Sequence, residues 1–306
     1  MSDTPDSPSD VWSEWLLHVR HGNDPAVAAT MRTDTEQYAN RVLDAAQLAP
    51  GMRLADIGAG EGLIAFQAIE RVGPTLSVLL TDVSAPLLRY AESLAIARGI
   101  HNQCSFLLRP ADRLDGVENA SLDVVASRAA LAYVADKSAA LREFRRVLKP
   151  GGRISFAEPI LQDEAFLTAA LRTAVNTPGA QSQDRFQQLL HRWKAAQYPD
   201  TLETIAANPL VGFSERNLFE IVRSAGFTDI HLELHIDLRR SMVRSWDVFL
   251  QTSPHPLAPS TGVILEEKFT AEERAFFEKR MRPVVESPAA MAVTRVVYLN
   301  ATKPLD

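Results

Sequence analysis

Two hydrophobic periodicities alternate along the chain between residues 51 and 158. Apolar runs of about five residues are typical of buried strands, and apolar residues three or four apart are typical of amphipathic helices. Strand-like runs occur at 52–57, 76–80, 104–108, 122–126 and 153–157, and helix-like stretches at 63–72, 84–98 and 137–148. Strands that alternate with helices predict a parallel sheet with helices on both faces.

The alternation stops after residue 158. Residues 159–212 are polar, aromatic and helix-like, without a strand pattern. Residues 228–238 alternate with a period of two and residues 291–302 are rich in strand-forming residues, so each predicts a strand. Between them lies a second insertion, 241–290, in which Thr270 and Glu273 have the spacing of a helix capping box.

Composition narrows the class of protein. The 306 residues are 46% hydrophobic and 23% charged, which excludes disordered and fibrous classes. A single cysteine excludes a disulfide framework or a multi-thiolate zinc site, and predicts a reducing, cytoplasmic compartment. No apolar run reaches the roughly 20 residues that span a bilayer. The net charge of −6 disfavours a nucleic-acid partner, because such binding depends on clustered Lys and Arg.

A glycine-rich turn follows the first predicted strand. The segment reads Leu54-Ala-Asp-Ile-Gly-Ala-Gly-Glu-Gly-Leu63, with Gly58, Gly60 and Gly62 close together. These glycines let the backbone turn tightly and approach a ligand without a Cβ in the way. Between a strand and a helix, such a turn predicts a ligand-binding loop.

The charge of this loop indicates its ligand. The dinucleotide fingerprint Gly-x-Gly-x-x-Gly requires a third glycine where this chain has Leu63. Asp56 precedes the first glycine, and Glu61 lies inside the loop. Two carboxylates repel a pyrophosphate but attract an amino or sulfonium cation. A cationic ligand is therefore expected, and a nicotinamide-dependent dehydrogenase is the weakest alternative.

Two further acids follow later strands. Asp82 ends the second strand 20 residues after Gly62, where a carboxylate can accept both hydroxyls of a ribose. Asp112 follows the third strand in Arg109-Pro-Ala-Asp-Arg113, where it can meet an adenine amino group. Alternatively, the first caps the next helix and the second is a solvated loop residue. The conjunction of Asp82 with the glycine loop favours the ligand-binding interpretation.

These segments resemble the cofactor loops of class I S-adenosylmethionine-dependent methyltransferases. The resemblance rests on Asp-Ile-Gly-Ala-Gly-Glu-Gly, Thr-Asp82-Val-Ser and Pro-Ala-Asp112. Residues 121–134, followed by Arg142-Glu-Phe-Arg-Arg-Val-Leu-Lys-Pro-Gly-Gly152, are similar to the ubiquinone/menaquinone-biosynthesis type of small-molecule methyltransferase. The match covers residues 51–158 well and 213–240 loosely.

The resemblance implies the fold and the domain organisation. It implies a Rossmann-like α/β fold with a seven-stranded, mostly parallel sheet of order 3-2-1-4-5-7-6, in which 228–238 and 291–302 supply the last two strands. A disordered tail at 1–10 is expected before a single methyltransferase domain at 11–306. The parts of that domain are an N-terminal helical lid (11–50), a cofactor-binding core (51–158), a helical cap insertion (159–212), and the C-terminal part of the sheet with the second, helical insertion (213–306).

The resemblance also implies S-adenosylmethionine as the cofactor. Asp56 and the glycine loop would hold the methionine part, Asp82 the ribose, and Asp112 with its neighbour the adenine. Ser127 and Arg128 would lie near the methionine end and the methyl group. The predicted cofactor-binding residues are Asp56, Gly58, Ala59, Gly60, Gly62, Asp82, Val83, Ala111, Asp112, Ser127 and Arg128. No metal is expected.

Methyl transfer is an in-line displacement at a sulfonium carbon, so the enzyme mainly supplies alignment and excludes water. A general base is needed only if the acceptor must lose a proton. Candidates are Glu158, Tyr133, His18 and His21. Alternatively, Glu158 binds backbone at the strand end, Tyr133 packs in the following helix, and both histidines are solvated. Four further histidines are expected to be structural or exposed: His191, His231, His235 and His255.

The acceptor is less well defined. Cys104 lies inside a predicted strand, which argues against arsenic methylation and pyrimidine C5 methylation, and the Asn/Asp-Pro-Pro-Tyr motif of adenine methylation is absent. Aromatic residues outside the core favour a small, partly apolar acceptor, although aromatics at helical spacing are more often core residues. They are Trp12, Trp15, Tyr38, Phe166, Phe186, Trp193, Tyr198 and Phe213.

The sequence therefore predicts an S-adenosylmethionine-dependent methyltransferase of a small metabolite. The alternative is a protein of this fold that binds the cofactor for regulation or assembly without methyl transfer. The helix around Phe269, Phe276, Phe277 and Met281 predicts a packing element or a homodimer contact. The expected partners are a small-molecule acceptor and a second copy of the chain, with no nucleic acid and no membrane.

Overall fold

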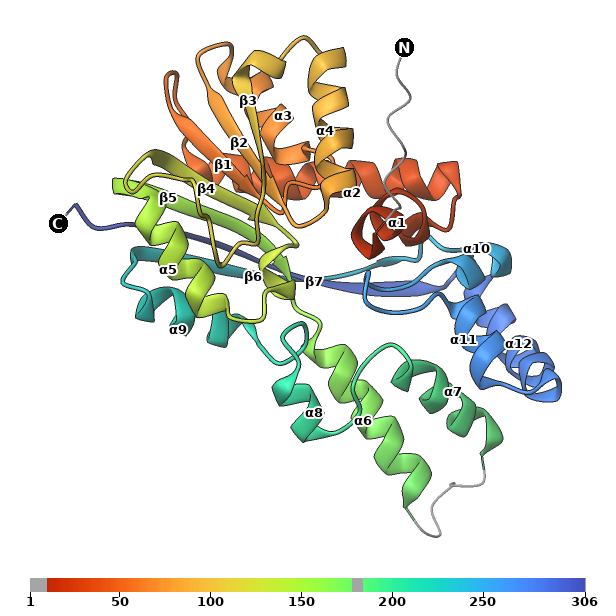
Figure 1. Cartoon of the computed structure of the whole chain (residues 1–306). Coiled ribbons are helices and arrows are strands. Elements are labelled where there is room, and N and C mark those ends of the chain that lie inside the picture. Colours follow the sequence, from red (N-terminus) through yellow and green to blue (C-terminus); the bar gives the residue numbers. More distant parts are fainter. Residues whose placement is uncertain (1–9, 178–183, 306) are drawn as a thin grey trace.

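One seven-stranded sheet organises the part of the chain that the structure describes. The computed structural model describes residues 10–177 and 184–305 (Figure 1). The strands are β1 (Arg53–Ile57), β2 (Ser77–Asp82), β3 (Cys104–Leu108), β4 (Leu122–Arg128), β5 (Leu148–Pro159), β6 (Thr228–Arg240) and β7 (Met291–Thr302). Their order is β3-β2-β1-β4-β5-β7-β6. β1 to β5 pair in parallel and β7 is antiparallel to β5 and β6, which confirms the predicted topology.

Helices cover both faces of this sheet, as predicted. α2 (Pro25–Ala46), α3 (Leu63–Val72) and α4 (Ala85–Ala97) bury apolar residues on one face. α5 (Lys137–Val147) and α9 (Glu215–Ser224) bury theirs on the other (Figure 1). Successive side chains of a strand point to opposite faces, which is why neighbouring residues of β1 and β4 belong to different hydrophobic clusters.

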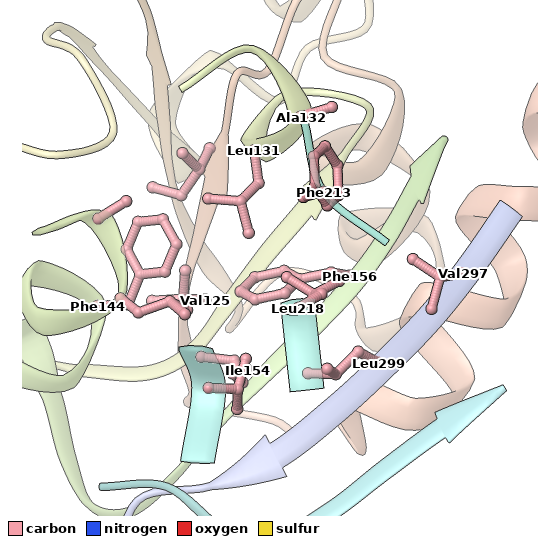
Figure 2. Packing of buried hydrophobic residues seen from close by; sticks show 14 of the residues in the cluster. Val125, Leu131, Ala132, Phe144, Ile154, Phe156, Phe213, Leu218, Val297 and Leu299 are labelled. Carbon is pink, nitrogen blue, oxygen red and sulfur yellow. The ribbon is translucent and has the colours of Figure 1, made fainter. Parts of the chain in front are cut away.

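The cluster under α5 and α9 holds the centre of the sheet together (Figure 2). Phe144 of α5 and Phe156 of β5 pack with their ring centroids 5.8 Å apart. Leu218 of α9 and Leu299 of β7 are buried in the same cluster. Burial on both faces explains why these strands are continuous apolar runs in the sequence.

Local signals set several element boundaries where the sequence predicted them. α3 and β3 have the predicted bounds. The Ser84 hydroxyl caps α4 by accepting a hydrogen bond from the Leu87 amide. Thr270 and Glu273 form the predicted capping box at the start of α12 (Ala271–Val285). These contacts involve only residues close in sequence, so the sequence pattern was sufficient to find them.

β5 begins earlier than the sequence predicted. A break was expected at residues 149–152, but the strand already starts at Leu148. The Gly151 amide donates to the Lys303 carbonyl, and the Lys303 amide donates to the Gly152 carbonyl. The C-terminal end of the chain therefore holds this Pro-Gly segment in the sheet, which no local pattern indicates.

Asp10, the last residue of the predicted tail, belongs to the start of a helix. Asp10 is the N-cap of α1 (Val11–Leu17), and its carboxylate accepts a hydrogen bond of 2.8 Å from the Ser13 amide. The Asp10 carboxylate also accepts from the Ser84 hydroxyl at 3.1 Å, which ties the start of α1 to α4. Residues 1–9 lie outside the described residues.

Two groups of helices extend beyond the sheet (Figure 1). The cap insertion contains α6 (Gln162–Asn176), α7 (Arg185–Ala195) and α8 (Leu202–Ala207), and the second insertion contains α10 (Trp246–Gln251), α11 (Thr261–Lys268) and α12. A third hydrophobic cluster joins α7 to the second insertion through Trp193, Trp246 and Phe277. Phe277 is therefore part of a packing element within the chain. Three short 3₁₀ helices, η1 (Val19–His21), η2 (His101–Gln103) and η3 (Leu131–Tyr133), complete the described elements.

No helix in the described ranges combines the length and the apolar character that crossing a membrane requires.

Candidate functional site

A cavity of about 330 Å³ lies at the carboxyl ends of β1, β2 and β4. In open α/β sheets this edge is where ligands bind. The turns after β1 to β4 and the segment formed by α1 and η1 (the α1–η1 segment) contribute its walls. Nine predicted cofactor residues line it: Asp56, Gly58, Ala59, Gly60, Asp82, Val83, Ala111, Asp112 and Arg128.

Two glycines give the turn after β1 its shape. Gly58 and Gly62 have φ angles of +65° and +82°, which favour glycine. A Cβ on Gly58 would lie 2.2 Å from the Cβ of Ala130, and a Cβ on Gly62 would lie 2.6 Å from the Phe66 ring. Gly58 therefore allows the turn after β4 to approach the loop. Gly62 does not line the cavity, and its place is at the start of α3.

Asp56 is a buried carboxylate at the edge of the cavity, with 2% of its surface exposed. Its Oδ2 accepts a hydrogen bond of 3.1 Å from the Ala65 amide in the first turn of α3. Burial raises the pKa of Asp56 to about 7, and the nearby Asp82 acts in the same direction, while Arg128 opposes it. A cation beside Asp56 would favour its ionised form.

Asp82 ends β2 and connects two loops of the cavity. Its Oδ2 accepts from the Gly60 amide at 2.8 Å, and its Oδ1 accepts from the Ser84 amide at 2.9 Å. Burial raises its pKa, whereas these two bonds lower it. A carboxylate has about four lone-pair sites, so both oxygens can accept further hydrogen bonds. The carboxylate can thus position the glycine loop and bind hydroxyls together.

Two arginines bring positive charge to the same cavity. The Arg20 guanidinium of the α1–η1 segment lies 3.5 Å from the Glu61 carboxylate. Within the described chain no hydrogen bond or ion pair is recorded for the Arg128 guanidinium, whose pKa is lowered by burial and raised by Glu61, Glu158 and Asp56. Arginine stays protonated in proteins, so Arg128 is a cation available to an anionic group of a ligand.

The turn after β3 forms another wall. Its Arg109 amide donates to the Asp82 carbonyl at 3.1 Å, which joins this turn to the end of β2. Ala111 and Asp112 line the cavity, together with the apolar side chains of Val83 and Leu87. Apolar surface next to one carboxylate suits a flat heteroaromatic ring with an amino group.

The α1–η1 segment covers the cavity with aromatic residues. Trp12, Trp15 and Leu16 line it. The Trp12 ring meets the Tyr133 ring edge-on with centroids 5.1 Å apart, and Trp15 Nε1 donates to the Ser253 carbonyl at 3.2 Å. Trp12 and Trp15 thus line the cavity at the strand ends. Five other aromatic residues among those that favoured an apolar acceptor line neither this cavity nor the second one described below: Tyr38, Phe166, Phe186, Trp193 and Phe213.

Only one of the predicted catalytic residues lines the cavity. That residue is Tyr133, and burial raises the pKa of its phenol. His18 is exposed at the C-terminal end of α1, and His21 Nε2 lies 2.9 Å from the Leu17 carbonyl oxygen. Neither histidine lines the cavity.

Glu158 does not line the cavity and has 0% of its surface exposed. Its carboxylate accepts hydrogen bonds from the Ser127 hydroxyl at 3.2 Å and from the amides of three residues that follow β4. Ser127, which makes this hydrogen bond, is also buried and does not line the cavity either. This geometry favours the backbone-binding alternative, in which Glu158 positions the turn that carries Arg128 and Tyr133.

A second cavity shows what sequence reasoning missed. It lies beside the first, and Tyr133 lines both. Tyr198 and His255 line the second cavity, and His255 was expected to be structural or exposed. Arg20 lines the first cavity and was not predicted at all. Neither Arg20 nor His255 lies in a sequence motif. Only the folding of the two helical segments over the sheet brings them to these cavities.

A sheet of this order with a ligand cavity at its strand ends defines the class I methyltransferase fold. The chain matches the family described as "Methyltransferase domain" over residues 48–203, which is 156 of its 306 residues, and it belongs to that family. The predicted resemblance is therefore confirmed, and so is the Rossmann-like fold.

Two relatives agree with this assignment, and a solved structure shares the fold. The chain is 29% identical over 205 residues to the nocamycin O-methyltransferase of Saccharothrix syringae. The matched region covers 65% of this chain and 67% of the relative. It is 31% identical over 121 residues to a ubiquinone/menaquinone biosynthesis C-methyltransferase of Shewanella frigidimarina, over 40% of this chain and only 48% of the relative. The YcgJ protein of Bacillus subtilis shares the fold with a TM-score of 0.50 at 16% identity, over 88% of this chain and 98% of that chain.

Proposed function

We propose that the protein is an S-adenosylmethionine-dependent methyltransferase of a small, partly apolar acceptor. One observation carries the proposal: a single cavity brings together the carboxylates of Asp56 and Asp82 and the unpaired guanidinium of Arg128. An amino acid joined to a nucleoside has an ammonium group, a carboxylate and ribose hydroxyls. These groups require two acceptor sites and one cation, which is the combination that lines the cavity.

The residues of the cavity fit this cofactor. Asp56 would bind the methionine ammonium, Arg128 the methionine carboxylate, and Asp82 the ribose hydroxyls. Asp112 would accept from the adenine amino group, next to the apolar surface of Val83. When bound, the cofactor supplies a methyl group on a sulfonium centre.

The chain itself supplies orientation and excludes water. Trp12, Trp15 and Leu16 line the cavity, where their apolar side chains would exclude water. Holding both reactants in line can lower the barrier by about 7–11 kcal/mol, and no general base is needed for an acceptor that is already nucleophilic. Tyr133 stands at the boundary of the two cavities, where it can orient an acceptor.

Calorimetric titration with S-adenosylmethionine and with its demethylated product tests the cofactor. The native protein is expected to bind both. Asp56→Ala and Gly60→Val are expected to weaken binding by at least about tenfold, because they remove a buried charge partner and obstruct the loop. The exposed Asp115→Asn is the matched control. Its binding should equal that of the native protein, since Asp115 is exposed and pairs with Arg113 in a surface loop.

Methyl transfer separates the proposed function from the alternative. With radiolabelled cofactor, label is expected to enter small molecules of a metabolite extract. Tight cofactor binding with no methylated product would instead support a regulatory or assembly protein. A cytoplasmic location stays a prediction from the single cysteine, and the absence of a nucleic-acid partner stays one from the acidic composition. A homodimer stays a prediction from the helix around Phe269, Phe276, Phe277 and Met281.

A further inference from the structure

The second cavity, also of about 330 Å³, has walls from both insertions. The cap insertion contributes the end of α7 and residues 208–211, and the second insertion contributes His255 and Leu257. Pro256, between these two residues, lines the first cavity instead. Tyr133 lines both cavities, so the second cavity adjoins the proposed cofactor site.

The lining of the second cavity is uncharged. Among the described residues, no Asp, Glu, Lys or Arg side chain lines it. Lys137 is near, but its Nζ donates to the carbonyls of Ala132, Val134 and Pro209 at 3.1, 3.0 and 2.7 Å. Leu210 and Val211 belong to the hydrophobic cluster of the sheet and give the lining an apolar part, beside the uncharged polar side chains of Gln197 and Asn208. A charged ligand would lose its hydration here without gaining a partner.

One polar group in this wall lacks a partner. His255 has 4% of its surface exposed, and its Nε2 lies 3.0 Å from the Gln197 carbonyl oxygen. A carbonyl can only accept, so Nε2 carries the hydrogen, and in the neutral ring Nδ1 is an acceptor. Burial lowers the pKa of His255, which favours this neutral ring. Nδ1 is buried and has no hydrogen-bond partner, which is costly unless a ligand supplies a donor.

Two tyrosines add neutral polar groups. Tyr133 and Tyr198 line the cavity, and no hydrogen bond of either hydroxyl is recorded within the described chain. The Tyr198 ring lies edge-on to His255, with ring centroids 5.3 Å apart. Burial raises the pKa of both phenols, so they remain neutral. The polar lining thus consists of neutral donors and acceptors.

We propose that this second cavity is the acceptor chamber, and that the acceptor is an uncharged, largely apolar molecule whose hydroxyl group donates a hydrogen bond to Nδ1 of His255. This inference rests on the proposed methyltransferase function and adds the chemical class of the acceptor. A protonated amine would need a carboxylate in the chamber and a carboxylic acid would need a cation, and the described lining offers neither. His255 acts as a specificity-determining residue.

Three naphthalene probes test the chamber by binding alone. 2-Naphthol is uncharged and has a hydroxyl donor, 2-methoxynaphthalene lacks the donor, and 2-naphthoate is an anion. With the protein saturated with S-adenosylhomocysteine, fluorescence titration is expected to show 2-naphthol binding about tenfold more tightly than 2-methoxynaphthalene, because only the former satisfies Nδ1. The anion is expected to bind most weakly. Equal binding of the first two, tightest binding of the anion, or no binding of 2-naphthol overturns the proposal.

Variants of His255 test whether this residue causes the preference for 2-naphthol over 2-methoxynaphthalene. His255→Leu is expected to abolish the tenfold difference between 2-naphthol and 2-methoxynaphthalene. His255→Gln keeps a donor for the Gln197 carbonyl, and so the local fold, and its Oε1 can accept a hydrogen bond, so it should restore part of the difference that His255→Leu loses. The control is His101→Gln on the surface, where His101 pairs with Glu92. A preference that survives in full in His255→Leu contradicts the role of Nδ1.

Cofactor titration of the same variants separates this inference from the proposed function. Both His255 variants are expected to bind S-adenosylmethionine within twofold of the native protein, since His255 does not line the first cavity. If the native protein does not bind S-adenosylmethionine, the proposed function fails. If it binds the cofactor but methylates only amines or acids in a panel that includes neutral hydroxyl compounds, or methylates none of them, the acceptor class fails and cofactor binding stands.

Discussion

At the scale of single residues, the buried carboxylate of Asp56 couples protonation to folding. Burial raises its pKa from 3.8 to about 7. At pH values between 3.8 and about 7, the folded protein therefore holds a proton that the unfolded chain has released. The contribution of this residue to stability is full below about pH 4 and is lost as the pH rises through about 7. Above that range the folded state has to bury a charged carboxylate, unless a cation lies beside it.

The variant Asp56→Asn removes this titration. Relative to the native protein, its free energy of unfolding is expected to be clearly larger at about pH 8 than at about pH 5. The variant thus gains stability relative to the native protein as the pH rises. Urea unfolding of both proteins at the two pH values measures the difference. The exposed Asp115→Asn should show no such dependence on pH. The same difference at both pH values for Asp56→Asn would mean that the carboxylate is already ionised at about pH 5.

The sequence could predict the site residues whose roles follow from nearby residues in the chain. Asp56 and Gly58 belong to one loop, and Asp82 follows a strand at a spacing that the loop makes informative. His255 has no such neighbour, because its meaning depends on the Gln197 carbonyl, 58 residues away, and on the fold of two insertions. Glu158 could be placed at a strand end but not oriented, and the structure shows its carboxylate turned to the main chain.

At the scale of elements, the α1–η1 segment is the cover of the cofactor cavity. It contributes Trp12, Trp15, Leu16 and Arg20 to the lining, and the Trp15 indole is fixed by the Ser253 carbonyl. The resemblance implied a helical lid at residues 11–50. Hydrophobic periodicity alone does not distinguish a helix that lies over a ligand site from one that lies over the sheet, because both surfaces are apolar.

Trp15→Ala tests this cover. It is expected to weaken S-adenosylmethionine binding by about tenfold or more, because the indole supplies apolar area that the ligand would bury. The melting temperature should change little, since Trp15 belongs to none of the three hydrophobic clusters. Val11→Ala is the control, because Val11 lies on the same helix but is 54% exposed. Equal affinities of the two variants in calorimetry would show that α1 does not cover the ligand.

β5 shows why element boundaries depend on distant partners. Its first residues, with Pro150 and Gly151, have the local character of a helix stop. They become strand because the segment after β7 pairs with them, as the exchange of hydrogen bonds with Lys303 shows. α3 needs no such partner, because it lies between Gly62 and Gly73, and its predicted bounds agree with the structure. Prediction therefore succeeds where the deciding contacts are local.

At the scale of the whole molecule, the two insertions act as one unit. They are separated in sequence by α9 and β6, yet each supplies a wall of the second cavity. What joins them is the hydrophobic cluster in which Trp193 of α7 packs on Phe249 and Phe277, with ring centroids 5.6 and 6.1 Å away. Trp193 Nε1 also donates to the Thr261 hydroxyl at 3.3 Å. The shape of the chamber therefore depends on a contact that touches no ligand.

Trp193→Ala is expected to separate chamber integrity from cofactor binding. Loss of this buried indole should lower stability by about 3–5 kcal/mol in urea unfolding and weaken 2-naphthol binding, because the two walls lose their common anchor. S-adenosylmethionine affinity should stay within about twofold, since the carboxylates and Arg128 are held by the sheet. Leu202→Ala, at a residue of the cap insertion that is 72% exposed, is the matched control and should change neither quantity. Undiminished 2-naphthol binding in a destabilised Trp193→Ala protein would show that the chamber is shaped by the sheet rather than by the contact between the insertions.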